Sequence, residues 1–284
     1  MTGLDNFVRK HDYLVCVDSD GCAMDTMNCK HIHCFGPCMV TQWGLETWEK
    51  EILQRWNEIN LFQMTRGINR FKGLAQALGE IDARYTPISG VKTLQQWADN
   101  APALSNDALA AAIDACADEE GKDCLRKALA WSVDVNKNIV ALPEALKIPF
   151  PGARDGLEAA HRFADVAVVS SANRDAVDEE WTNHRLFDHV DIVLAQDVGS
   201  KVHCIARMLE FGYEKDHVLM VGDAPGDLDA AARNGVLFYP ILVNREEESW
   251  TNLRQTALGH LAEGSYHGEY QEKMRQSFLE NLGG

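Results

Sequence analysis

Two aspartates separated by one residue, Asp18 and Asp20, are the first side chains whose type and spacing could do chemistry. They follow the apolar run of residues 13–17 and precede Gly21. A short unbroken apolar run is typical of a buried parallel strand, and open α/β sheets hold their functional groups beyond the carboxyl ends of such strands. Many surface turns also carry Asp-x-Asp-Gly, so the pair indicates a site only if partners occur further along the chain.

Three later stretches supply such partners. Ser170 and Ser171 offer a hydroxyl and backbone amides at a predicted helix start, which is a ready anion site. Lys201 offers a fixed positive charge at the next helix start, and Asp223 and Asp227 follow another apolar run. Carboxylates gathered around one lysine would repel one another unless a hard cation lay among them. Mg²⁺ is the natural candidate, because it binds a few carboxylates, several waters and substrate phosphate.

The elements that would position these side chains alternate between strand and helix beyond residue 151. The sequence predicts strands at residues 166–169, 192–195, 217–221 and 236–243, and helices at 153–163, 174–183, 202–211 and 228–234. With the first strand at 13–17, this alternation predicts an α/β fold with a doubly wound, Rossmann-like parallel sheet.

The segment between the first strand and this region is predicted to be helix and loop. Apolar spacing predicts helices at 45–61, 71–78 and 91–100, one capped by Ser105 and one starting at Asp123, after an irregular connection at 23–37. We therefore expect a core domain of residues 1–26 and 145–284. An all-helical domain of residues 27–144 would be inserted after its first strand.

The order of these motifs resembles the haloacid dehalogenase superfamily. Four motifs of that family occur here in sequence: Asp18-x-Asp20-Gly21, then Ser170, then Lys201, then Gly222-Asp223-x-x-x-Asp227. The inserted helical segment is similar to the family's α-helical cap of the first type. The resemblance covers the core segments, roughly residues 14–25 and 151–243.

The resemblance implies a role for each matched residue. Asp18 would attack phosphorus and form an aspartyl-phosphate, and Asp20 would protonate the leaving oxygen and then deprotonate the attacking water. Ser170, with the amide of Ser171, would hold the phosphoryl group while Lys201 balances its charge. A carboxylate can attack a phosphate dianion only when their repulsion is offset by positive charge.

The metal would be held by Asp223, a carboxylate oxygen of Asp18 and the backbone carbonyl of Asp20, with Asp227 supporting that shell. One residue departs from the family pattern: Cys22 stands where Thr or Val is usual, so a hydroxyl contact is replaced by a weak thiol donor. We expect this change to tune the site and leave activity intact.

The presence of Asp20 favours a phosphate ester as substrate. Relatives that cleave carbon–halogen or carbon–phosphorus bonds need no acid for an alkoxide leaving group. The resemblance therefore implies a Mg²⁺-dependent phosphatase. A phosphomutase would share every residue named, while a phosphonatase or a non-catalytic binding protein fits the set of acids less well.

The loop from Arg66 to Arg70 resembles the substrate-reading loop of β-phosphoglucomutase-type enzymes and related phosphatases. Arg70 stands at the arginine position of that loop, and a guanidinium suits a second phosphate or a carboxylate because it can bind both oxygens. The alternative for Arg66 and Arg70 is an exposed arginine paired with one of the many acids.

Composition bounds the class of protein. The formal net charge of the 284 residues is −16, which argues against a nucleic-acid partner, because such binding rests on clustered Lys and Arg. No apolar stretch approaches the roughly 20 residues of a spanning helix, and the first 12 residues lack a signal-peptide apolar region. We expect a cytoplasmic monomer or homodimer acting on a small phosphorylated molecule.

The eight cysteines are expected to stay reduced, since the chain is long and carries no predicted secretory signal. Five soft side chains lie close in sequence: Cys29, His31, His33, Cys34 and Cys38. Their spacing matches no paired Cys-x-x-Cys arrangement, and the sequence leaves metal binding there open.

Overall fold

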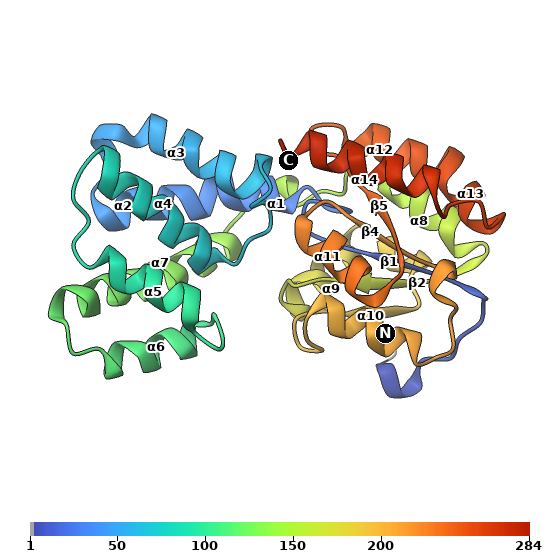
Figure 1. The fold of residues 1–284 in the computed structure, drawn as a ribbon, viewed down its shortest axis with the longest axis horizontal. Helices are drawn as coiled ribbons and strands as arrows, with labels where there is room; N and C mark the ends of the chain where they lie inside the picture. Colours follow the sequence, from blue (N-terminus) through green and yellow to red (C-terminus); the bar gives the residue numbers. More distant parts are fainter. Residues whose placement is uncertain (1–2) are drawn as a thin grey trace. The chain divides into compact units, whose positions relative to one another are not determined.

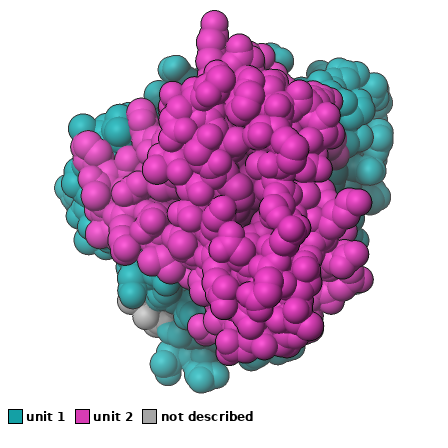
Figure 2. Space-filling view, turned by 90° about the vertical axis from the view of Figure 1, so that its left-hand side faces the viewer, with its two compact units in different colours: residues 1–27, 144–284 teal, residues 28–143 magenta. Residues whose placement is uncertain are grey.

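The structure of the protein, a computed structural model, describes residues 3–284. The chain divides into two compact units (Figure 1): unit 1 comprises residues 1–27 and 144–284, and unit 2 comprises residues 28–143. Figure 2 shows the surface of unit 2 in magenta. These ranges lie one residue from the predicted boundaries at each junction. The function of unit 2 as a cap stays a prediction.

Unit 1 is built on a single parallel sheet. Its five strands, in the spatial order β3-β2-β1-β4-β5, are β1 (Tyr13–Val17), β2 (Ala164–Val169), β3 (Ile192–Leu194), β4 (Val218–Gly222) and β5 (Leu237–Pro240). The central strand β1 pairs with β2 on one side and β4 on the other. The predicted α/β fold with a Rossmann-like parallel sheet is confirmed.

Helices pack on both faces of this sheet (Figure 1). The helices beyond residue 143 are α8 (Ala153–His161), α9 (Arg174–Asn183), α10 (Lys201–Leu209), α11 (Pro225–Asn234), α12 (Glu246–Asn252), α13 (Leu258–Ala262) and α14 (Glu269–Asn281). Apolar side chains of α8, α9, α12 and α13 share a core with one face, and those of α10 and α11 share a core with the other.

Each strand contributes to both cores by alternation. Val15 and Val17 of β1 belong to the first core, whereas Leu14 and Cys16 belong to the second. Successive side chains of a strand point to opposite faces, so a strand covered on both faces is apolar throughout. The unbroken apolar run at residues 13–17 therefore places β1 at the centre of the sheet.

Unit 2 contains only helices, turns and loops among its residues, all of which the structure describes. Its main helices are α2 (Gly36–Trp43), α3 (Glu49–Asn57), α4 (Arg70–Arg84), α5 (Val91–Asn100), α6 (Asn106–Ala115) and α7 (Glu119–Val140). Large aromatic side chains fill its centre: Trp56 and Trp131 are fully buried with ring centroids 6.1 Å apart. The Trp131 indole N–H donates to the Phe35 carbonyl at 3.1 Å.

Two local predictions were wrong. The irregular connection expected at 23–37 contains α1 (Thr26–Lys30), a π-helical segment (His31–Phe35) and the start of α2. Pro37 lies in the first turn of α2, and the backbone is helical without interruption from Thr26 to Trp43, so Pro37 does not mark a break. Helix α7 begins four residues before Asp123, because the Asp118 carboxylate caps it by accepting from the Gly121 amide at 2.8 Å.

No helix within residues 3–284 combines the length and the apolar character needed to cross a bilayer.

Candidate active site

Asp18 and Lys201 form the centre of a buried charged group at the carboxyl edge of the sheet. Asp18 directly follows β1, and its amide donates to the Val221 carbonyl of β4 at 3.0 Å. Lys201 is the first residue of α10, which Ser200 caps by accepting from the His203 amide. The Lys201 Nζ lies 2.8 Å from Asp18 Oδ2 and 2.6 Å from Asp227 Oδ1. One lysine thus bridges two buried carboxylates.

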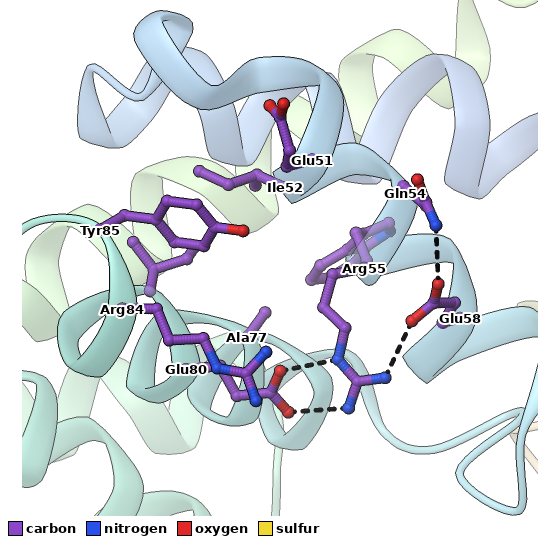
Figure 3. Close-up of a pocket in the computed structure, with 11 residues that line it drawn as sticks. Glu51, Ile52, Gln54, Arg55, Glu58, Ala77, Glu80, Arg84 and Tyr85 are labelled. Carbon is purple, nitrogen blue, oxygen red and sulfur yellow. Dashed lines mark hydrogen bonds and ion pairs between the residues drawn. The ribbon is translucent and has the colours of Figure 1, made fainter.

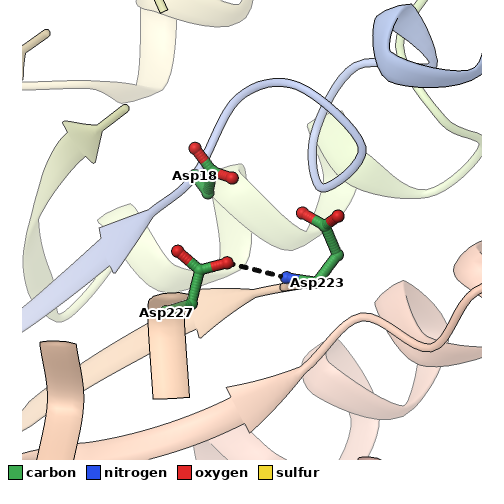
Figure 4. A group of neighbouring side chains, drawn as sticks. All are labelled: Asp18, Asp223 and Asp227. Carbon is green, nitrogen blue, oxygen red and sulfur yellow. Dashed lines mark hydrogen bonds between the residues drawn. The ribbon is translucent and has the colours of Figure 1, made fainter. Parts of the chain in front are cut away.

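Asp227 is held on both of its oxygens. It lies in the first turn of α11, where its Oδ2 accepts from the amides of Asp223 at 3.2 Å and Ala224 at 3.0 Å (Figure 4). The other oxygen accepts from Lys201. A Cβ at Gly222 would meet the Asp227 carboxyl carbon at 2.3 Å, so this close approach requires glycine. These contacts suit Asp227 to support a metal shell.

Asp18, Asp223 and Asp227 each place a carboxylate oxygen within 4.8 Å of the others (Figure 4). All three are buried. Among residues 3–284, this is the one group of at least three His, Cys, Asp or Glu side chains with such spacing. Its donors are all oxygen, which is the ligand type that Mg²⁺ prefers. The donor set therefore fits the predicted metal.

Burial and neighbouring charges shift the pKa values of this group. Burial raises the pKa of Asp18, Lys201 opposes that shift, and the two neighbouring carboxylates add to it. Burial also acts to lower the pKa of Lys201, but Asp18 and Asp227 outweigh it and leave that pKa raised. Lys201 is therefore a permanent cation, and it compensates only part of the negative charge of three carboxylates.

The strand order explains why these residues meet. The chain leaves β1 toward β2 on one side, while β4 lies on the other, so β1 and β4 flank the point at which the direction of winding reverses. Open α/β sheets form their ligand crevice at such a point. Asp18 follows β1 and Asp223 follows β4, so both flank that reversal point.

Ser170 and Ser171 follow β2 at the same edge. The Ser170 amide donates to the Leu194 carbonyl at 3.0 Å, and its hydroxyl accepts from the Ala172 amide at 3.2 Å. Ser170 is buried, whereas Ser171 is exposed. Asn173 caps α9 by accepting from the amides of Asp175 and Ala176. The segment has the hydroxyl and helix start expected of an anion site.

The loop after Asp18 is held in place by hydrogen bonds from residues that the sequence did not indicate. The Trp181 indole donates to the Ser19 hydroxyl at 2.8 Å, and the Trp250 indole donates to the Cys22 carbonyl at 3.0 Å. The Thr26 hydroxyl donates to Asp20 Oδ1 at 2.5 Å. Thr26 is the first residue of α1. Because that segment was predicted to be irregular, there was no reason to expect the Thr26 hydroxyl near Asp20.

Cys22 is fully buried beside the acids. Burial, reinforced by Asp223 and Asp18, raises the pKa of its thiol well above the usual value. The thiol therefore stays protonated, and its contact is with the Val221 carbonyl at 3.6 Å. A protonated thiol is a poor nucleophile, so Asp18 has no competitor at this position.

Arg66 and Arg70 belong to unit 2. Arg66 is buried, and its Nη1 donates to the Leu61 carbonyl at 2.7 Å. Arg70 lies over the Phe35 ring at 5.0 Å, and its Nη1 donates to Asn136 Oδ1 at 2.7 Å and to Ser132. Burial lowers the pKa of Arg70. Nη1 of each arginine is therefore hydrogen-bonded within the protein. That either arginine contacts the substrate stays a prediction.

The Cys/His-rich stretch lies in and beside the π-helical segment. His31 stacks on Phe35 at 4.5 Å and accepts from the Trp56 indole at 3.2 Å. Cys38 accepts from the Asn138 amide at 3.1 Å. These contacts belong to helix packing.

Comparison with known families and structures identifies the class. The sequence model of the haloacid dehalogenase-like hydrolase family matches residues 90–241, which is more than half of the chain. The protein therefore belongs to the haloacid dehalogenase-like hydrolases and is an enzyme of that class. The matched segment includes Ser170, Lys201, Asp223 and Asp227 but begins after Asp18, which the fold brings to the same group.

Solved structures resemble this chain at low sequence identity. A candidate phosphoglycolate phosphatase from Lactobacillus delbrueckii subsp. bulgaricus is 13% identical with a TM-score of 0.50, covering 81% of this chain and 86% of that one. A candidate haloacid dehalogenase-like hydrolase from Bacteroides fragilis is 15% identical (TM-score 0.45, covering 84% and 93%). The L-2-haloacid dehalogenase of Xanthobacter autotrophicus is 16% identical (TM-score 0.40, covering 92% and 86%). Comparison with curated protein sequences gave no significant match.

Proposed function

We propose that the protein is a Mg²⁺-dependent phosphatase of small phosphorylated metabolites, acting through an aspartyl-phosphate on Asp18. One observation carries this proposal: a buried carboxylate directly after the central strand lies 2.8 Å from a lysine and beside two more carboxylates. Such a carboxylate can attack a phosphate only if nearby positive charge offsets their repulsion. Lys201 supplies one charge, and the acids supply ligands for a cation.

The contacts of each residue favour a particular role for it. Asp18 and Asp223 would hold Mg²⁺ with the backbone carbonyl of Asp20, and Asp227 would support them through its bonds to Lys201 and the Asp223 amide. When bound, the metal would supply positive charge to the phosphate oxygens. Ser170 and the Ser171 amide would bind the phosphoryl group.

Asp20 is proposed as the acid and base. The Thr26 hydroxyl donates to its Oδ1, which fixes the carboxyl orientation. In its first step Asp20 would give a proton to the ester oxygen that leaves. In its second it would take a proton from the water that attacks the aspartyl-phosphate, which returns Asp18 to its carboxylate form.

Arg70 is proposed to bind the rest of the substrate. Its hydrogen bonds to protein within residues 3–284 all use Nη1, so Nε and Nη2 remain for a ligand. Arg66 is proposed with it, on the same loop. Arg70→Lys should raise KM while changing kcat little, because a lysine cannot bind two oxygens side by side. Lys72→Arg, an exposed change on the same helix, is the matched control.

The decisive experiment measures release of inorganic phosphate from a panel of phosphorylated sugars, nucleotides and small acids, phosphoglycolate included. Each compound is assayed with Mg²⁺ and with chelator, using the wild type, Asp18→Asn and the exposed control Asp216→Asn. Release that needs Mg²⁺ and Asp18 supports the proposal. Release that survives Asp18→Asn contradicts the nucleophile, and release that survives exhaustive chelation contradicts the metal.

A phosphomutase is the second candidate, because it would use the same residues. The two differ in whether the aspartyl-phosphate passes to water or to a sugar. Isomerisation of a sugar monophosphate that is stimulated by the corresponding bisphosphate, without phosphate release, would favour the mutase.

A further inference from the structure

Trp181 joins two parts of the candidate active site within unit 1. Its side chain is fully buried in α9, and its indole N–H donates to the Ser19 hydroxyl at 2.8 Å. Ser19 is itself fully buried, and it stands between Asp18 and Asp20 in the chain. The indole therefore connects α9 to the residue that directly follows the proposed nucleophile.

The backbone of Ser19 organises the loop after β1. Its carbonyl accepts from the amides of Cys22 at 3.2 Å, Ala23 at 3.0 Å and Met24 at 2.9 Å. The Ser19 amide is different, because within residues 3–284 it donates to no protein group. A buried backbone amide without an acceptor is rare and costly, so this donor suits a ligand of the site. The indole and the three amides thus hold in place a residue whose own amide remains for substrate.

Helix α9 also adjoins the segment proposed to bind the phosphoryl group. Asn173 caps the helix, and Ser170 precedes Asn173 by three residues. Trp181 lies in the same helix, about two turns beyond its start. Because Ser170 lies next to the start of the helix and Trp181 lies within it, the indole hydrogen bond ties the position of Ser19 to that of Ser170.

We propose that Trp181 is a positioning residue, whose bond to Ser19 sets the direction in which the Asp18 carboxylate approaches the phosphoryl group. This inference rests on the proposed function. Attack on phosphorus needs the attacking and leaving oxygens roughly in line, and a small misplacement of a reacting group lowers the rate strongly. Binding of the phosphate before reaction is less demanding, since Ser170 and Lys201 would hold it without Ser19. Loss of the bond should therefore lower kcat more than it raises KM.

The test compares two substitutions that remove the two halves of this bond. Trp181→Phe keeps an aromatic ring and removes the donor, and kcat for phosphate release should fall about tenfold while KM changes less than about twofold. Ser19→Ala removes the acceptor and should lower kcat by a similar factor. The double variant should be no slower than either single variant, because both changes break the same bond. Independent roles would instead multiply to a loss of about a hundredfold.

Two controls separate positioning from a general loss of stability. Tyr213→Phe also removes a buried donor from unit 1, since the Tyr213 hydroxyl donates to Asp165 at 2.6 Å at the amino end of the sheet. Glu80→Gln breaks the paired bonds of 2.7 and 2.9 Å by which Arg55 joins α3 to α4 in unit 2 (Figure 3). Urea denaturation should show a loss of stability for both controls and for Trp181→Phe. Only Trp181→Phe should lower kcat per folded molecule.

The outcomes separate this inference from the proposed function. A wild-type kcat in folded Trp181→Phe, or a double variant in which the two single losses multiply, would overturn the role of Trp181 and leave the phosphatase proposal intact. If Trp181→Phe does not fold, Ser19→Ala decides, since an unchanged kcat there would equally overturn the inference. A wild-type protein that releases no phosphate from any compound of the panel would overturn both proposals.

Discussion

The two ends of the sheet in unit 1 both bury aspartates beside a lysine, yet they balance charge differently. At the carboxyl end, Asp18, Asp223 and Asp227 lie within 4.8 Å of one another with Lys201 as their lysine partner. Three buried carboxyl groups beside one lysine are an incomplete arrangement, because buried like charges are costly.

The amino end holds its aspartates with protein groups alone, apart from Asp165 Oδ1, which is buried without a hydrogen-bond partner. The buried Asp165 Oδ2 accepts from the Lys10 amide at 3.0 Å, the His11 amide at 3.1 Å and the Tyr213 hydroxyl at 2.6 Å. Asp191 accepts from Lys10 Nζ at 2.6 Å and from the Val166 amide at 2.9 Å. This end therefore serves stability, whereas the carboxyl end sacrifices stability for the proposed site, which a cation and a phosphate would complete.

The sharpest way to break this comparison is to change one aspartate at each end. Asp18→Asn should lower phosphate release by about 10⁴-fold or more, because an amide is a poor nucleophile toward phosphorus. The fold should persist, as judged by circular dichroism. A residual rate within about tenfold of the wild type would mean that the attack does not come from Asp18.

At the amino end, Asp165→Ala should lower the free energy of unfolding by about 3 kcal/mol, because two amides and a buried hydroxyl lose their acceptor. Urea denaturation measures this change, with the exposed Asp12→Ala as control. Phosphate release per folded molecule should be unaltered. If Asp165→Ala lost activity without losing stability, the assignment of this end to stability would be wrong.

Asp223→Asn should have the opposite sign from Asp165→Ala when no divalent cation is present. Removing one of the three crowded carboxyl groups should raise the free energy of unfolding by about 1–2 kcal/mol. Wild-type Tm should rise on addition of Mg²⁺, and the variant should lose that rise. Thermal unfolding with chelator tests the gain in stability, and thermal unfolding with Mg²⁺ tests the lost rise in Tm. A Tm of the variant below that of the wild type in chelator would contradict the charge imbalance.

The smallest expected effect is a pH dependence of the free energy of unfolding, which arises at the amino end of the sheet. Burial acts to raise the pKa of Asp191, but hydrogen bonds from Lys10 and Val166, with His161 nearby, lower it below the usual value. A lowered folded-state pKa gives stability that is present above the unfolded pKa of about 3.9 and is lost as pH falls through the folded value. Asp191→Asn should therefore cost about 1 kcal/mol at pH 7 and almost nothing near pH 2. Equal costs at both pH values would refute the sign.

Sequence patterns predicted the sheet well because burial on both faces makes each strand apolar throughout, as in Val218–Gly222. The residues that follow these strands must then meet at one edge, which is why Asp18, Lys201 and Asp223 could be named together. Thr26 and Trp181 could not be found this way. Their bonds to Asp20 and Ser19 depend on where α1 and α9 pack, and no local pattern encodes that.

In helix-rich unit 2, even more of the side-chain contacts depend on how the helices pack, which the sequence does not predict. Arg70 was named from its loop, but its resting place over Phe35 depends on the packing of three helical segments.

The two indole hydrogen bonds to the loop after Asp18 have an optical consequence. The chain contains seven tryptophans, and unit 1 holds only Trp181 and Trp250, while the other five lie in unit 2. Each of the two donates to the Ser19–Cys22 segment. Replacing the five tryptophans of unit 2 by phenylalanine would leave an emission spectrum whose two fluorophores both report on the Ser19–Cys22 segment. Occupancy of the acid group could then be followed by light, without turnover.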